Sequence, residues 1–286
     1  MKTKKAGFLA TIAAFILLLI VAGAGFEKTG AGERGMKTTE NLNGKTLAGI
    51  TGMRLSEESA EVFFETLYGI SLAGYHAADT IPELLYDLRS NRADAIWVPD
   101  VTARYLLHAA ENEDLARLST PEDTAGSAED GGRFELALAL RPEAETLCTE
   151  LSAAIMEMKS DKTMEKLAVA YVEADSPMDF YEKAKGTGKV FYVGVTGTLP
   201  PIDRYDRNGV PCGFSAAFLS ELSNRTGYRF VMVKVTPENA FTELAAKKID
   251  LLLAFGTGKT TTPGKKDYIT TRGYYTIQEY ACLSVK

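Results

Sequence analysis

Short apolar runs alternate with amphipathic stretches along the chain. KTLAGIT (45–51) and DAIWV (94–98) contain uninterrupted apolar runs, which are typical of strands buried on both faces. After Ser56 the apolar residues recur at helical spacing: Val62, Phe63, Leu67 and Ile70. A hydroxyl followed by two acids suits the positive end of a helix, so Ser56 is the expected start. Thr80-Ile81-Pro82-Glu83 predicts a second start as a capping box, and Trp97 is expected in the core.

The second half of the chain has the same organisation. KVFYVGVT (189–196), YRFVMVKV (228–235) and IDLLLAF (249–255) are predicted strands. GFSAAFLSELSNRTG (213–227) is a predicted helix that ends at its glycine. Strands that alternate with helices predict mostly parallel sheets covered by helices on both faces.

A short phrase occurs twice. Gly49-Ile50-Thr51-Gly52 and Gly194-Val195-Thr196-Gly197 each close the first predicted strand of a half. The later stretches 80–98 and 236–254 also correspond, with an Asp six residues after a Leu in both. The sequence therefore predicts two α/β lobes of similar construction, and the repeated phrase marks the first strand of each lobe.

Composition and charge narrow the function. The chain has 45% hydrophobic and 24% charged residues, which is globular composition. The net charge is −6, and there is no Lys/Arg-rich block beyond the first five residues, so nucleic acid is not an expected partner. The three cysteines, Cys148, Cys212 and Cys282, favour buried free thiols, although one bridge remains open.

The N-terminus predicts export. Lys2, Lys4 and Lys5 precede an uncharged apolar run at 6–25, which closes on the small residues of 22–24. We expect residues 1–25 to be a signal peptide, with a permanent membrane anchor as the alternative, and residues 26–40 to be a tether. The expected location is extracytoplasmic, in the periplasm or at the cell surface.

Several motifs resemble a known family. PPIDRYDRNGVPCGF (200–214), FTELAAKKIDLLL (241–253) and TPGKKDYITTRGYY (262–275) resemble the opening half of type II periplasmic solute-binding proteins of the amino-acid-binding family. NLNGKTLAGITG (41–52) and LRSNRADAIWVPD (88–100) resemble the second half of that family, as do the residues that follow up to 170.

The resemblance implies a two-lobed, periplasmic-binding-protein-like (Venus flytrap) α/β fold in circularly permuted order. Lobe 2 would be 42–131, and lobe 1 would combine 133–178 with 189–286. The linker 179–188 would join the former chain ends, and only a crossing near Gly131–Glu135 would remain covalent. A remnant of a tandem array, with one half missing from each copy, stays open, as does exchange of lobes between two chains.

The candidate ligand-binding residues lie where strands end, because parallel α/β sheets bind ligands at the carboxyl ends of their strands. Lobe 2 would contribute Thr51, Gly52, Met53, Arg54 and Asp100, and lobe 1 would contribute Thr196, Tyr205, Thr257, Thr262, Lys265 and Arg272. The resemblance assigns Asp100 to a ligand ammonium, with a helix N-cap as the alternative. It places Lys265 where the family has a carboxylate-binding Arg, with Arg272 as the alternative for that role. Arg54 is either a carboxylate clamp or a solvated side chain.

The expected function is capture of a small polar or zwitterionic, amino-acid-like ligand between two lobes, without chemistry. No catalytic residue, metal or cofactor is expected. The partner would be an ABC-type membrane permease or a membrane sensor. Two alternatives remain: a dehydratase-like enzyme on the same fold, with Asp100 as general acid, and a ligand-free interaction scaffold.

Overall fold

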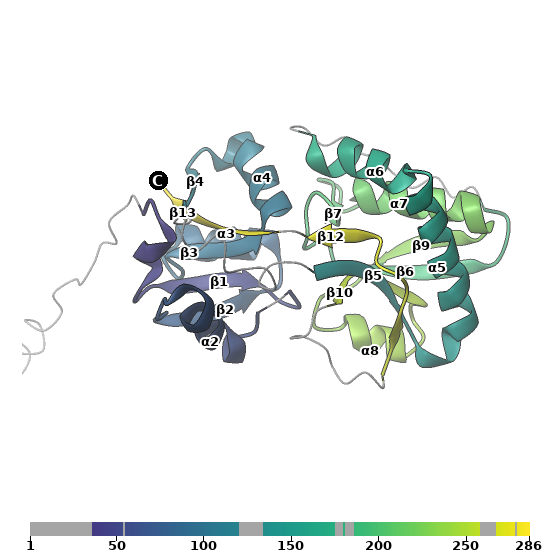
Figure 1. Cartoon of the computed structure of the whole chain (residues 1–286), viewed down its shortest axis with the longest axis horizontal. Coiled ribbons are helices and arrows are strands. Elements are labelled where there is room, and N and C mark those ends of the chain that lie inside the picture. Colours follow the sequence, from purple (N-terminus) through teal and green to yellow (C-terminus); the bar gives the residue numbers. More distant parts are fainter. Residues whose placement is uncertain are drawn as a thin grey trace, which may run out of the picture. The chain divides into compact units, whose positions relative to one another are not determined.

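The first sheet gathers strands from distant parts of the sequence (Figure 1). In this computed structural model its order is β2-β1-β3-β13-β4, with β1 (Thr46–Ile50), β2 (Gly74–Ala78), β3 (Ala95–Pro99), β4 (Leu115–Arg117) and β13 (Tyr280–Val285). β1 pairs in parallel with β2 and β3, whereas β13 runs antiparallel between β3 and β4. The two apolar runs near the start of the chain thus form neighbouring inner strands, in keeping with their composition.

The structure describes residues 36–53, 55–119, 134–174, 180, 186–257, 267–277 and 279–286. The expected signal peptide or anchor and most of the expected tether lie outside these ranges. Thr38 bridges to Ser119, and the 3-10 helix η1 (Thr39–Leu42) follows, so the last residues assigned to the tether are part of the fold. Among the described residues, no helix combines the length and the apolar character that crossing a bilayer requires.

The helices of the first sheet begin close to where the sequence predicts. They are α2 (Glu57–Tyr68), α3 (Ile81–Arg89), α4 (Asp100–His108) and the 3-10 helix η2 (Ala110–Asn112). Ser56 caps α2, and Thr80 Oγ1 accepts a hydrogen bond of 3.2 Å from the backbone N–H of Glu83 at the start of α3. Hydroxyl caps satisfy backbone donors that the first turn of a helix leaves without partners.

Both faces of the first sheet are buried. On one face Leu84 and Leu88 of α3 pack with Ile96 of β3. On the other face Phe64 of α2 packs with Trp97, which is 6% exposed, so the expectation of a core tryptophan is confirmed. Covered faces explain why these strands carry apolar residues at consecutive positions rather than at alternate ones.

The second sheet has the order β11-β5-β10-β6-β9, with β12 also paired to β5. Its strands are β5 (Phe134–Leu140), β6 (Val190–Val195), β9 (Arg229–Lys234), β10 (Leu251–Thr257), β11 (Ile269–Thr270) and β12 (Tyr275–Ile277). β6 is parallel to β9 and β10, and β5 is antiparallel to β10. β7 (Arg204–Tyr205) and β8 (Pro211–Cys212) form a small separate ribbon. Residues 134–140 and 190–277 therefore share one sheet.

Helices enclose the core of the second sheet. They are the 3-10 helix η3 (Pro142–Ala144), α5 (Glu145–Ser160), α6 (Thr163–Ala168), the π-helix η4 (Val169–Glu173), α7 (Phe214–Thr226) and α8 (Ala240–Ala245). Leu151 and Ile155 of α5 and Phe218 of α7 are fully buried in one cluster with Val193 of β6. Burial of such side chains stabilises the fold by about 1.5–3 kcal/mol each.

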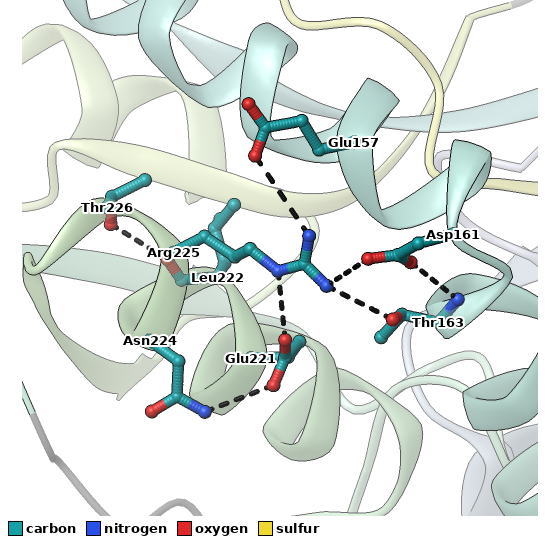
Figure 2. A network of polar contacts seen from close by, with 8 residues as sticks. All are labelled: Glu157, Asp161, Thr163, Glu221, Leu222, Asn224, Arg225 and Thr226. Carbon is teal, nitrogen blue, oxygen red and sulfur yellow. Dashed lines mark hydrogen bonds and ion pairs between the residues drawn. The ribbon is translucent and has the colours of Figure 1, made fainter.

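Arg225 of α7, which follows the expected 179–188 linker, binds residues at the end of α5 and the start of α6, which precede it (Figure 2). Its guanidinium lies 2.6 Å from Asp161 Oδ2, 3.1 Å from Thr163 Oγ1 and 3.0 Å from Glu221 Oε1. The Thr163 hydroxyl and then Arg225 lower the pKa of Asp161 to about 2. Helices on either side of the expected 179–188 linker are thus joined by charged hydrogen bonds as well as by apolar packing.

One boundary expected from the sequence is wrong. The sequence predicts that residues up to 286 belong to the lobe of β6, but β13 lies in the sheet of β1 (Figure 1). Its side chains explain this, because Ala281 and Leu283 fit the cluster under α3 while Cys282 fits the cluster under α2. Among the described elements, β4 and β5 lie in different sheets and so do β12 and β13, which gives two crossings and not only the one near Gly131–Glu135.

Candidate functional site

The repeated phrase forms the same turn in both sheets. Thr51-Gly52 follows β1 and Thr196-Gly197 follows β6, at the carboxyl ends of parallel strands. Gly52 has φ +77° and Gly197 has φ +70°, a backbone conformation that favours glycine. We refer to these as the Thr51 turn and the Thr196 turn.

The glycines of the phrase have packing roles. A Cβ on Gly49 would collide with the hydroxyl of Tyr75, and one on Gly197 would collide with the ring of Tyr205. A Cβ on Gly194 would press on Ile249. At three of the four glycine positions a neighbouring side chain therefore already fills the space that a side chain would need. At Gly52 nothing lies within 4 Å of a built Cβ.

Asp203 holds the Thr196 turn in shape. Its Oδ2 accepts hydrogen bonds from Thr196 N (3.1 Å), Gly197 N (2.9 Å) and Thr196 Oγ1 (3.0 Å). The side chain is 1% exposed, and burial raises the pKa of its carboxyl group despite these donors. The sequence analysis did not single out Asp203. Its only signal in the sequence is an acidic residue six positions after Gly197.

Tyr205 covers the same turn. Its hydroxyl donates to Val195 O at 2.5 Å, and its ring lies against Gly197. Burial raises the pKa of the Tyr205 hydroxyl, so the phenol keeps its proton and can donate. The ammonium of Lys234 lies 5.0 Å from the centre of the Tyr205 ring. The structure thus brings together two predicted site residues, Thr196 and Tyr205, and places Lys234 beside them, a residue that the sequence analysis did not single out.

Asp100 starts α4 at the carboxyl end of β3. Its Oδ2 accepts from Arg104 Nε at 3.0 Å, and its Oδ1 lies 2.6 Å from Arg117 Nη1. Its backbone N–H donates to Glu279 O at 2.9 Å. Asp100 is the first residue of the helix, with Pro99 at the N-cap, so the alternative of a side-chain cap is wrong.

One face of α4 meets elements of the second sheet. Val101 belongs to the apolar cluster of that sheet, and Tyr105 lies under the guanidinium of Arg204 at 5.7 Å. The charges of Asp100 and Arg104 also act on Tyr275 of β12, whose pKa burial raises to about 12. Positions 100, 101, 104 and 105 share one side of a helix, so a single face of α4 carries these contacts. Met53, beside the Thr51 turn, packs against the clusters of both sheets.

Among the residues it describes, the structure does not bring the other predicted site residues together with these groups. Arg54, Thr262 and Lys265 lie outside the described residues. Thr257 is the last residue of β10, where its backbone pairs with Glu135. The backbone N–H of Arg272 donates to Ser152 Oγ of α5 at 3.1 Å, which places this residue beside the helix layer. Within the described ranges, no group of His, Cys, Asp and Glu side chains is arranged to hold a metal ion.

Residues 191–280 match the profile of a family described as "Bacterial extracellular solute-binding proteins, family 3". The matched stretch runs from β6 to the first residue of β13 and contains the Thr196 turn, Asp203, Tyr205 and Lys234. The resemblance that the sequence shows in this half is therefore confirmed. A comparison with curated protein sequences found no match.

Solved structures that this chain resembles share little sequence with it. The ligand-binding component of an ABC-type import system from Staphylococcus aureus, with zinc bound, is 9% identical; the match covers 84% of this chain and 65% of that chain, with a TM-score of 0.40. The GluR0 ligand-binding core in complex with L-glutamate is 10% identical, with coverage of 85% and 84% and a TM-score of 0.41. This chain thus spans slightly less than two thirds of the Staphylococcus aureus chain.

Proposed function

We propose that this protein is an exported solute-binding protein, which captures a small polar ligand between the carboxyl ends of its two sheets and releases it unchanged. The observation that carries the proposal is the family match over residues 191–280. Amino-acid-like zwitterions are among the candidate ligands, because the resemblance in the sequence is to the amino-acid-binding family.

The geometry supports this proposal. The Thr51 and Thr196 turns both follow first strands at the edge where parallel α/β sheets bind ligands. On the face of α4 that begins at Asp100, Val101 packs in the apolar cluster of the second sheet and Tyr105 lies under Arg204 of β7, so groups from both lobes meet near these ends. A ligand that contacts both edges would favour the state in which they are close.

We further propose that the lobes are those of the family in permuted order. Lobe 2 would be 42–131 completed by β13, and lobe 1 would be 133–178 with 189–277. The pairing of β5 with β10 supports this order, since these strands come from segments on either side of the 179–188 linker. The boundary at 277 replaces the expected one at 286 because β13 lies between β3 and β4.

The proposal assigns the output to a partner. An ABC-type permease would take up the ligand, or a membrane sensor would respond to the loaded protein. The N-terminal residues 1–25 would direct export and then be removed or remain as an anchor.

A dehydratase-like activity is not favoured. Its general acid was to be Asp100, and a general acid must carry a proton on a carboxyl oxygen. Both oxygens of Asp100 are bound by guanidinium groups, Oδ1 by Arg117 and Oδ2 by Arg104. Asp100 is therefore placed as an ion-pair acceptor.

The test is a binding screen with recovery of the ligand. Thermal unfolding of the whole chain is followed with a panel of amino acids, short peptides and organic acids, because a ligand of the native state raises the melting temperature. A compound that raises it is then titrated by calorimetry and recovered for mass spectrometry. Stoichiometric binding with an unchanged mass supports the proposal, and turnover supports the enzyme. A panel without any binder supports the scaffold.

A further inference from the structure

The carboxylates of Asp203 and Asp100 already bind donor groups of the protein itself. Asp203 accepts three hydrogen bonds from Thr196 and Gly197. Asp100 faces two guanidinium groups, so the cluster of Asp100, Arg104 and Arg117 carries one surplus positive charge. A ligand ammonium group that approached Asp100 would meet the guanidinium groups of Arg104 and Arg117, which lie 3.0 Å and 2.6 Å from the carboxylate oxygens of Asp100. The two guanidinium groups would repel a third cation, so this carboxylate is a poor site for an ammonium group.

The charge that remains available at the Thr196 turn is positive. Lys234 is exposed at the end of β9, directly opposite Val195 in the strand register. Its ammonium lies over the Tyr205 ring, and that ring rests on Gly197. Among the described residues, Lys234 has no ion-pair partner. A cation held by an aromatic face and lacking a carboxylate partner is suited to bind an acidic group.

We propose that the ligand is a small organic anion without an ammonium group, with its acidic group held by Lys234 at the Thr196 turn. This inference rests on the proposed solute-binding function and specifies the ligand class for the same site. Carboxylates and sulfonates share the chemistry that Lys234 recognises, and a lysine binds either as a point charge.

The rival class is a zwitterion, which needs a carboxylate for its ammonium group. Asp79 could supply one, because it follows β2 at the carboxyl end of the first sheet and is half-buried. Its backbone N–H donates to Glu83 Oε2 at 3.0 Å, and the described residues give its side chain no ion pair. Asp79→Asn is therefore the variant that would expose zwitterion binding.

The experiment compares ligand pairs in which the ammonium group is replaced, by hydrogen in glutarate against L-glutamate and by a hydroxyl in L-lactate against L-alanine and in isethionate against taurine. Each is titrated into the whole chain by calorimetry. We expect at least one acid of a pair to bind and its amino counterpart to bind more weakly. Lys234→Gln should weaken that binding about tenfold or more, since it removes a charge-assisted contact.

The chain offers a matched control for Lys234. Lys189 lies 4.9 Å from the Phe191 ring and is likewise exposed, but it precedes β6 and so lies at the opposite end of the strands. Lys189→Gln should leave affinity unchanged, and urea unfolding of both variants verifies that they are folded.

Tighter binding of the amino compounds, with loss of that binding in Asp79→Asn, would overturn this inference and leave the proposed function standing. Equal affinity of Lys234→Gln and the unchanged chain for the acid would also overturn it. Failure of every compound in both the pairs and the wider panel would count against the proposed function itself, and this inference would fall with it.

Discussion

Tyr280 stacks face to face on Trp97, with ring centroids 3.9 Å apart and an angle of 14° between the ring planes. Trp97 lies on β3, and Tyr280 is the first residue of β13, which enters the sheet next to β3. The stack marks the place where the last strand of the chain completes the first sheet. Trp97 is the only tryptophan of the sequence, so its fluorescence reports on this sheet.

Leu283→Ala should strongly destabilise the first sheet. Leu283 is fully buried on β13, and removing a buried leucine side chain costs about 2–5 kcal/mol. Urea unfolding followed by Trp97 emission should show a midpoint shifted to lower urea. Val190→Ala is the control, because Val190 is 40% exposed on β6 and should cost about 0.5 kcal/mol or less. Equal midpoints for the two variants would contradict the placement of β13.

Gly197→Ala should destabilise the Thr196 turn by about 2–4 kcal/mol, because it combines a left-handed backbone with a collision against the Tyr205 ring. Gly209→Ala isolates the backbone part. Gly209 has φ +76° with nothing within 4 Å of a built Cβ, so about 1–2 kcal/mol is expected. The free energy of unfolding of both variants is measured by urea titration. The packing role of Gly197 is refuted if the two losses are the same.

The ion pair of Asp161 predicts that the free energy of unfolding depends on pH. The Thr163 hydroxyl and Arg225 lower the pKa of Asp161 from its usual value of 3.8 to about 2. A depressed folded pKa contributes stability that is present above about pH 4 and is lost as the pH falls through 2. The difference in unfolding free energy between the unchanged chain and Asp161→Asn should therefore be largest near pH 5 and shrink toward pH 2. Its measurement is urea unfolding at several pH values in this range.

Glu61→Gln is the control for that series. Glu61 is an exposed residue of α2, and the described residues give it no ion pair. Its difference from the unchanged chain should stay flat from pH 5 to pH 2. A flat series for Asp161→Asn as well would argue against the network of Figure 2.

The permuted order predicts that the protein still folds when a linker joins residue 286 to residue 36 and the chain is opened between residues 180 and 186. Lys286 N donates to Asp114 O and Thr39 N donates to Ser119 O, so both ends of the described chain lie along β4. A linker of about eight residues spans that distance. Residues 186–286, the linker and residues 36–180 in this order should give the same far-UV circular dichroism and the same Trp97 emission as the natural order. A reordered chain that stays unfolded while the natural order folds would favour the tandem-array origin.

The sequence alone determined the local elements and their repetition. Uninterrupted apolar runs identified β1, β3, β6 and β10, and the hydroxyl caps Ser56 and Thr80 identified the starts of α2 and α3. These features depend on neighbouring residues, so periodicity and capping chemistry suffice. The repeated phrase also located both turns, including Thr196, because a positive φ imposes glycine locally.

Only the tertiary structure decided which groups meet. β13 carries apolar residues on both faces, and its place follows from the clusters under α2 and α3, which local sequence does not encode. In the same way, the fold of the chain brings Asp203 and Lys234 to the Thr196 turn, and Asp100 is bound to Arg117 from a different strand. Long-range pairing depends on the shape and charge of surfaces assembled from distant segments, whereas periodicity reports only on a residue and its neighbours.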